Sequence, residues 1–510
     1  MAVSRPGVYV QESVLQQTNT LNDRSDAVGV LIGALPIGPT APTLIRSWPE
    51  FVKFFGGLNY SYPTSIAAKL FFSNGGRDAY IRRVTHSDAD TAQVNIVDED
   101  GAATAVAVAS SPGSWANSTG SFPIAIEVTA GGSEGRFNVI VYGPPPTAAA
   151  DIRSNILEQF SDLSMSPSDS RYAVAVVNAF SNYFILTDSE TGNAPSTTEG
   201  LKHPTGGADG SAVTRTDLLG AHTDFDNIRT PLLMNLPDTQ TFTFNEGAGA
   251  NADLLSYAEA RGDAFVIIDS PAGAPVSGVT GVTAYSTQCV SSATGANGAI
   301  YYPWLSIPDT SKAIPGILIN VAPGGAVMGQ YQDTDVSRGV FKTPAGYNNR
   351  LNGVVALERV LTNSELDALN SAANPVNAIR VAPGAGIVIM GGRTLSVASS
   401  NRYINMRRSL IYVKKEVTDR TSFAVFENND SILWTKINAK LVNFLKNYWS
   451  QGGLKGASPS EAFFVRCDSS NNTPSEIAQG KVNIEIGLAL EYPAEFVIIN
   501  IGQLSSTATA

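Results

Sequence analysis

Cysteine is almost absent from this 510-residue chain. Cys289 and Cys467 are the only two, widely separated and outside any Cys-x-x-Cys pair. Such a pattern builds neither a disulfide framework nor a zinc ribbon. The sequence therefore excludes a disulfide-stapled secreted fold and favours a reducing compartment.

Long apolar runs and positive charge are also lacking. No uninterrupted stretch of about 18 apolar residues could span a bilayer, and the first ten residues lack the apolar core of a signal peptide. The net charge is -11 and the pI is near 4.9, which disfavours general adhesion to nucleic acid or to an anionic membrane. We expect a protein made and assembled in a cytoplasm, without membrane insertion or direct nucleic-acid binding.

What is present is enough apolar material for several cores. The composition is 43% hydrophobic and 15% charged, and 510 residues exceed what one core usually fills. An apolar run at 27–33 ends in Gly and Pro turns, residues 66–72 favour a helix, and residues 79–84 favour the next strand. This order predicts an α/β layer, which resumes with a strand at 264–269.

Composition changes between residues 91 and 208, which are rich in Ala, Ser, Thr, Gly and Asn. Runs typical of strands recur there at 124–128, 137–142 and 183–186. A turn-rich stretch at 204–210 closes this part. We interpret residues 91–208 as an inserted β-rich domain that projects from the main body.

Towards the carboxyl end, a helix is predicted from an Asp430 cap to Tyr448, stopped by Gly452 and Gly453. Strict alternation over residues 482–490 predicts a half-buried strand. The last apolar run, 496–501, predicts another strand, and residues 8–10 near the start are also β-competent. Isolated strands need a sheet edge, which could belong to the same chain or to a neighbouring subunit.

Several motifs resemble catalytic or metal-binding patterns but lack the neighbouring residues or elements that such sites require. Residues 131–135 (GGSEG) match a nucleophile elbow, yet a strand follows where a helix is required, so a hairpin turn is favoured. His86 with Asp88 and Asp90, and His222 with Asp224 and Asp226, could bind a cation but also suit ordinary polar loops, the interpretation we favour. No catalytic signature surrounds any of the three histidines, so we predict no enzyme and no cofactor.

Other signals are similarly ambiguous. The Arg261-Gly262-Asp263 tripeptide precedes a strand, where a turn residue and a capping acid are expected anyway. No GxxxxGK[ST] phosphate loop occurs, which leaves ATP-driven work unsupported. Tyr403, Arg407, Arg408 and Tyr412 could stack on nucleic acid, but we interpret their spacing as strand alternation within a sheet or an interface.

Seven short segments, in order along nearly the whole chain, resemble one known family. They are RPGVYVQE at 5–12, YYPW at 301–304, VSRGVFKTPAG at 336–346, RTLS at 393–396, YINMRRSL at 403–410, EAFFVRCD at 461–468 and PAEFV at 493–497. Together they resemble the tail sheath proteins of contractile phages and of related bacteriocins and injection systems.

The resemblance implies an α/β and α+β multidomain fold. Its parts would be an amino-terminal arm (1–25), a middle α/β domain of subtilisin-like topology (26–90 and 209–380) and the inserted domain (91–208). A carboxyl-terminal sheath core domain (381–492) and a carboxyl-terminal arm (493–510) would complete it. Both chain ends would contribute to the sheath core.

The resemblance also implies how the subunits would be joined. In such sheaths, strands from both chain ends pair with the core sheet of adjacent subunits. Carried over by position, the exchanged residues would be Val8, Tyr9, Val10, Gln11, Phe496, Val497, Ile498, Ile499, Asn500 and Ile501.

The implied function is structural. Subunits would stack as hexameric rings in a helical lattice around an inner tail tube protein, contact baseplate and tail terminator proteins, and contract to drive the tube through a cell envelope. The location would be the virion tail, assembled in the host bacterial cytoplasm. A bacteriocin or cellular injection-system sheath is the nearest alternative; a subtilisin-like hydrolase and a surface adhesin are the more distant ones.

Charge along the chain suggests a surface for the tube. Residues 400–450 carry nine basic and four acidic residues, a net of +5 in an acidic chain. A basic inner surface could hold an acidic tube through salt-sensitive contacts. Lys436, Lys440 and Lys446 are our tube-facing candidates, although a solvated helix face explains them equally well.

Overall fold

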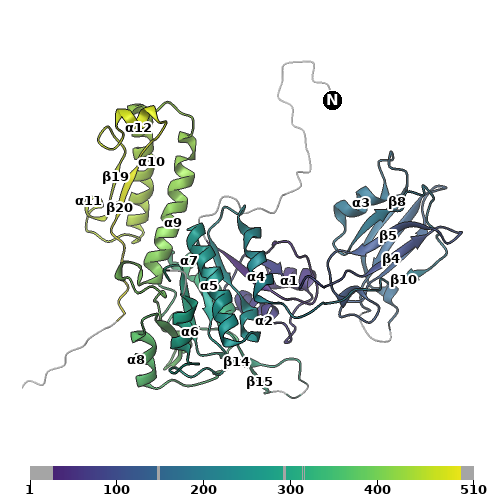
Figure 1. Cartoon of the computed structure of the whole chain (residues 1–510), viewed down its shortest axis with the longest axis horizontal. Coiled ribbons are helices and arrows are strands. Elements are labelled where there is room, and N and C mark those ends of the chain that lie inside the picture. The colour runs from purple at the N-terminus through teal and green to yellow at the C-terminus, as the bar shows by residue number, and fades with distance from the viewer. Residues whose placement is uncertain (1–26, 146–149, 291–293, 313, 315, 496–510) are drawn as a thin grey trace, which may run out of the picture.

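A computed structural model describes residues 27–145, 150–290, 294–312, 314 and 316–495. Figure 1 shows a central α/β body with two smaller parts at opposite ends of its long axis. One is the carboxyl-terminal part and the other is inserted after the third strand of the body. In the described residues, no helix combines the length and apolarity that crossing a bilayer requires.

The body is organised around an eight-stranded sheet in the order β18-β17-β13-β12-β11-β1-β3-β2. Its strands are β1 (Val28–Gly33), β2 (Thr43–Ile45), β3 (Ala79–Arg83), β11 (Leu232–Asn235), β12 (Ala264–Asp269), β13 (Gly298–Tyr302), β17 (Val376–Ala382) and β18 (Gly386–Ile389). The six inner strands pair in parallel, and the edge strands β2 and β18 pair antiparallel. Strands β1 and β12 are buried at every residue, as expected where helices cover both faces.

Two sets of helices cover the sheet. One face packs on α4 (Arg215–His222), α5 (Phe244–Arg261), α6 (Val282–Cys289) and α8 (Asn363–Ser371). The other packs on α1 (Trp48–Phe55), α2 (Pro63–Ser73), α7 (Gly324–Arg338) and the first turns of α9 (Ile404–Thr421). The predicted α/β layer is confirmed, with β1, α2, β3 and β12 where the sequence indicated them.

A small antiparallel sheet is attached to the body. It consists of β14 (Leu305–Pro308), β15 (Leu318–Val321) and β16 (Ala356–Leu357).

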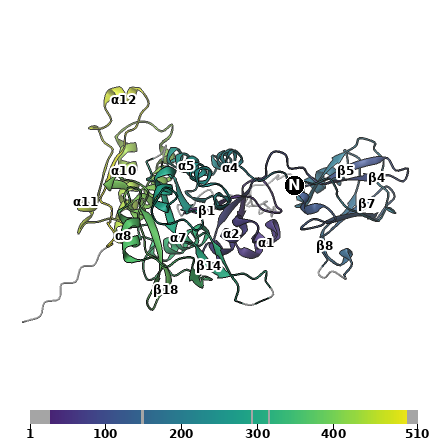
Figure 2. The same ribbon diagram turned by 60° about the horizontal axis from the view of Figure 1, so that its bottom comes forward.

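Between β3 and α4 the chain forms two small antiparallel sheets. They contain β4 (Gln93–Val97), β5 (Ala103–Ala109) and β9 (Phe184–Asp188) in one, and β6 (Ala125–Ala130), β7 (Phe137–Tyr142), β8 (Ile156–Leu163) and β10 (Leu201–Lys202) in the other, with helix α3 (Ala173–Phe180). These elements share a core of their own around Trp115. Figure 2 shows this part standing apart from the body.

The carboxyl-terminal part pairs two long helices with a two-stranded sheet. Its elements are α9, α10 (Ser431–Ser450), α11 (Pro459–Ala462), β19 (Phe463–Arg466), α12 (Pro474–Ala478) and β20 (Glu485–Leu488). The predicted cap is confirmed, since the Asp430 carboxylate accepts hydrogen bonds from Ile432 and Leu433 at the start of α10. Gly452 follows the C-cap Gln451 and has φ 85, which suits its expected role as a stop.

Two local predictions need correction. The spacing of Tyr403, Arg407, Arg408 and Tyr412 was interpreted as strand alternation, but Arg407, Arg408 and Tyr412 lie in helix α9 and Tyr403 is its N-cap. Because Ile404, Arg408 and Ile411 are all buried, the helical period explains this segment better.

The strand predicted over residues 482–490 is regular only at Glu485–Leu488. The strand is this short because its partner β19 offers only four residues for backbone pairing. The alternating residues Val482, Ile484, Ile486, Leu488 and Leu490 do pack against the helices, as expected.

Candidate functional site

A sheet that is open on both sides lies in the carboxyl-terminal part. Strand β19 pairs antiparallel with β20, from Phe463 opposite Leu488 to Arg466 opposite Glu485. Within the described residues no third strand joins either one. One face of this sheet packs on α9 and α10 through Ile486 and Leu488, while Phe464 is half exposed. Open edges present backbone donors and acceptors that another strand could use.

Both ends of the described chain lie next to helix α9. At the carboxyl end, the Arg393 guanidinium donates to the Glu495 carboxylate at 2.7 Å, and the Tyr403 hydroxyl donates to the same oxygen at 3.2 Å. Tyr403 also makes an edge-to-face contact with Tyr492. These contacts fix the last described residues against the start of α9.

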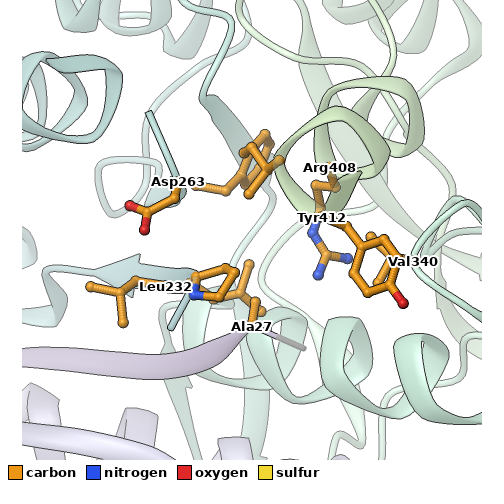
Figure 3. Close-up of a pocket in the computed structure, with 10 residues that line it drawn as sticks. Ala27, Leu232, Asp263, Val340, Arg408 and Tyr412 are labelled. Carbon is orange, nitrogen blue, oxygen red and sulfur yellow. The ribbon is translucent and has the colours of Figure 1, made fainter. Parts of the chain in front are cut away.

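At the amino end, the chain enters the body beside α9. Ala27 lines a cavity of about 10 Å³, about the space of one water molecule. Figure 3 shows Arg408 and Tyr412 of α9 on one side of it, and Leu232 and Asp263 on the other. The described chain therefore begins close to the carboxyl-terminal helices.

A buried ion pair connects these helices to the body. Arg408 of α9 donates two hydrogen bonds to the Asp335 carboxylate of α7, one of them 2.8 Å long. The two side chains are 3% and 1% exposed. The Arg408 guanidinium also lies 4.8 Å from the centre of the Tyr331 ring. Burial opposes the charge on Arg408, but Asp335 outweighs it, so the pKa of Arg408 is raised.

Helix α10 presents a polar face opposite its buried stripe. Lys436, Lys440 and Lys446 are all exposed on it. The Lys440 ammonium lies 3.8 Å from the centre of the Phe423 ring, so part of its surface is already used within the chain. Lys440 also lines an open groove of about 470 Å³ between α9 and α10, with stacked Tyr412 and Tyr448 among its walls. A basic, aromatic groove of this kind suits an acidic partner surface.

The proposed strand-exchange residues cannot be placed. Val8, Tyr9, Val10 and Gln11, and all of residues 496–501, lie outside the described residues. Their role therefore stays a prediction.

Two of the motifs that suggested chemistry, residues 131–135 and Arg261-Gly262-Asp263, form turns at the ends of helices or strands. Residues 131–135 form the predicted hairpin turn between β6 and β7, closed by a hydrogen bond from Gly131 to the Arg136 carbonyl. Gly262 is the left-handed C-cap of α5, and Arg261 donates to Asp263 at 2.6 Å. The predicted turn and acid are thus confirmed.

The two histidine motifs differ from each other. His86 lies in a loop, as expected, with its Nδ1 2.9 Å from the Asp217 carboxylate. His222 is instead the buried last residue of α4, so the loop interpretation was wrong there. In the described part of the chain, no three His, Cys, Asp or Glu side chains gather as a metal site would require.

Sequence reasoning missed two buried carboxylates at the carboxyl ends of neighbouring strands. Asp269 ends β12 and accepts from Asn235 at 2.9 Å and from the Gly324 amide of α7 at 2.6 Å. Asp238 accepts from the Ala34 amide and from the Thr64 hydroxyl. Burial raises the pKa of each to about 6. An acid at the end of an otherwise apolar, buried strand was the available signal for Asp269.

Comparison with known proteins adds sequence and fold evidence. Residues 396–503 match the family model of the phage tail sheath C-terminal domain. A tail sheath protein of Vibrio phage KVP40 is 27% identical over 186 residues, which is 36% of this chain. That match spans only 26% of the length of the phage protein.

Similarity of fold extends much further than similarity of sequence. The helical sheath of the anti-feeding prophage, solved in its contracted state, matches with a TM-score of 0.58 at 22% identity, over 98% of this chain and 100% of that one. A sheath tail protein from Listeria innocua matches with a TM-score of 0.61 at 12% identity, over 88% and 90% of the two chains. By sequence in its carboxyl-terminal part and by fold over nearly its whole length, the chain resembles the sheath proteins of contractile tails and injection systems.

Proposed function

We propose that this chain is the sheath subunit of a contractile tail, a structural protein that polymerises around an inner tube and shortens to drive the tube through a cell envelope. The main observation in support is that the sequence match and an open sheet occur in the same part of the chain. The segment that matches the sheath family model, 396–503, also holds an open two-stranded sheet, and helix α9 of the same segment lies next to both Ala27 and Glu495, the first and last described residues.

Strand exchange is the proposed linkage. Residues Val8 to Gln11 of one subunit and Phe496 to Ile501 of another would add to the edges of β19 and β20 in a third. Main-chain hydrogen bonds would then join subunits without requiring large flat interfaces. The open edges of β19 and β20 support this idea, because an edge strand presents backbone N–H and C=O groups with which an added strand can pair.

The proposed assembly follows from this linkage. Hexameric rings would stack in a helical lattice, with baseplate and tail terminator proteins at the ends, as part of a virion tail assembled in the host cytoplasm. The sheath of a bacteriocin or of a cellular injection system is the alternative, supported by the fold match to the anti-feeding prophage sheath.

We also propose how the subunit is divided into domains. Residues 1–25, 381–492 and 493–510 would form the sheath core, residues 26–90 and 209–380 a middle domain of subtilisin-like topology, and residues 91–208 a peripheral domain. The parallel strands of the body support the middle assignment, and the antiparallel edge strand β18 (Gly386–Ile389) adds to the same sheet from the range 381–492. We expect no catalytic activity, which a broad serine-reactive probe would check by failing to label the folded protein.

Assembly is the direct test of the proposed function. The purified protein mixed with its tube partner should give striated cylinders by negative-stain microscopy. Monodisperse globules in every condition, together with measurable hydrolytic turnover, would contradict the proposal.

Lys436, Lys440 and Lys446 are proposed to face the tube. Reversing all three to glutamate should leave the subunit folded, because all three are exposed, but prevent it from assembling on the tube. A matched control reverses Lys53, Lys312 and Lys342, which are also exposed and lie outside the carboxyl-terminal helices. Normal assembly of the first variant, or equal failure of both, would remove the tube-facing assignment.

A further inference from the structure

A buried arginine lies where the chain leaves the body for the inserted part. Arg83 is the last residue of β3 and is 2% exposed. Burying a guanidinium is costly unless its donors are satisfied. No carboxylate among the described residues lies within ion-pair distance of it. Burial lowers the pKa of Arg83 to about 10, so it remains charged at neutral pH.

The donors of Arg83 are satisfied by two separate loops. On the body side, its Nε donates to the Leu35 carbonyl at 2.8 Å and its Nη1 donates to the Gly38 carbonyl at 3.1 Å. On the inserted side, its Nη1 donates to the Ser111 hydroxyl at 3.1 Å and its Nη2 donates to the Pro112 carbonyl at 2.8 Å. One planar group therefore bridges the two parts.

The loop of residues 35–38, on the body side, contributes side chains to the core of the body and to the core of the inserted part. Leu35 packs in the core between the sheet and α1, α2 and α7, whereas Ile37 packs in the inserted core around Trp115. The loop passes close to the end of α1, because a Cβ at Gly38 (φ 117) would lie 2.3 Å from the Phe55 ring. Ser111 also connects to that inserted core, since its carbonyl accepts a hydrogen bond from the Trp115 indole at 3.1 Å.

The returning chain is held beside the same point. Asp209 accepts hydrogen bonds from the Ser114 amide and hydroxyl, both at 2.8 Å. Asp88, on the outgoing passage, accepts from the Ser211 amide and hydroxyl at 2.8 Å and 2.6 Å. Both connections between the two parts are thus cross-linked by hydrogen bonds.

We infer that Arg83 is a positioning residue, a clasp that fixes the orientation of the inserted part (residues 91–208) on the α/β body. Without it, the two cores would stay folded but the joint between them would act as a hinge. This inference does not depend on the sheath function, since it concerns the joint within one subunit.

The test is the distance between the two parts in the full-length chain. Cysteines introduced at the exposed positions Ser161 on β8 and Ser364 on α8 take spin labels, because native Cys289 and Cys467 are both buried. Pulsed electron spin resonance should give one narrow distance distribution. Arg83→Met should broaden it and speed protease cleavage between residues 84 and 91, with unchanged circular dichroism.

Arg153→Met is the matched control. Arg153 lies on the inserted part and is partly exposed, paired with Glu127, so its loss should leave the distribution narrow. A folded Arg83→Met protein with the distribution of the unmodified chain would overturn the inference. Should Arg83→Met fail to fold, the S111A variant decides: it keeps Arg83 but removes the hydrogen bond from Arg83 to Ser111 on the inserted side, so broadening supports the clasp and an unchanged distribution overturns it.

Discussion

Replacing Arg408 with methionine removes one half of the buried ion pair that joins α9 to α7. The Asp335 carboxylate would then be 1% exposed with its guanidinium partner gone. Removing one partner of a buried pair costs about 3–5 kcal/mol, because the remaining charge stays desolvated. A whole domain is stable by only about 5–15 kcal/mol, so we expect a large loss of stability at this joint.

The double variant R408M/D335L separates the net contribution of the pair to stability from the cost of leaving the Asp335 carboxylate buried without Arg408. Apolar replacement of both partners of a buried pair is often neutral or better, so the double variant should be more stable than R408M alone. Tyr331 would retain a side chain to pack against, since methionine approximates the length of the arginine stem.

Hydrogen exchange in increasing urea measures this locally, which matters in a protein with several cores. Peptides from α7 and α9 should lose protection at lower urea in R408M and recover it in the double variant, while peptides from β6 and β7 should not change. A loss below about 1 kcal/mol in R408M, a value typical of exposed pairs, would refute the reasoning. So would a double variant that is no more stable than R408M.

The remaining predictions concern pH and the chain ends. Burial raises the pKa of Asp269 from 3.8 to about 6, so the folded state binds this proton more tightly than the unfolded state, and stability falls by about 3 kcal/mol as pH rises from about 4 to about 6. Burial lowers the pKa of His222 from 6.5 to about 4, which has the opposite sign: stability is lost as pH falls from about 6.5 to about 4. Relative to the unmodified chain, urea unfolding across this range should therefore show D269N losing more stability on acidification and H222F losing less; parallel profiles for all three proteins would contradict both assignments. Deleting residues 1–12 should leave soluble subunits that sediment without forming long polymers, whereas polymers of normal length would argue against a linking role for the amino-terminal segment.

The elements that the sequence predicted well are those with a strong local pattern. Helix α10 has a capping acid, an apolar residue every third or fourth position and a glycine stop, so local signals alone locate it. Strands β1 and β12 are continuous apolar runs bounded by turns, typical of a parallel sheet covered on both faces.

The failures occurred where tertiary contacts decide the structure. The start of α9 buries Arg408 against Asp335, 73 residues earlier in the chain. Because a charged residue occupies a buried position of this helix, the apolar pattern that predicts a helix is interrupted there. Similarly, no local pattern in the sequence predicts the contacts of Arg83, because all of its partners except the Ser111 hydroxyl are main-chain carbonyls, which any residue provides. His222 is buried by the packing of α4 on the body, which no neighbouring residue predicts.

The most direct test of the account is a high-resolution cryo-electron microscopy map of the protein assembled with its tube. The account requires backbone density in which residues 8–11 and 496–501 extend the β19–β20 sheet of different subunits, forming a connected lattice. A lattice in which both segments fold back onto their own subunit's sheet, with no strand passing between copies, would contradict it.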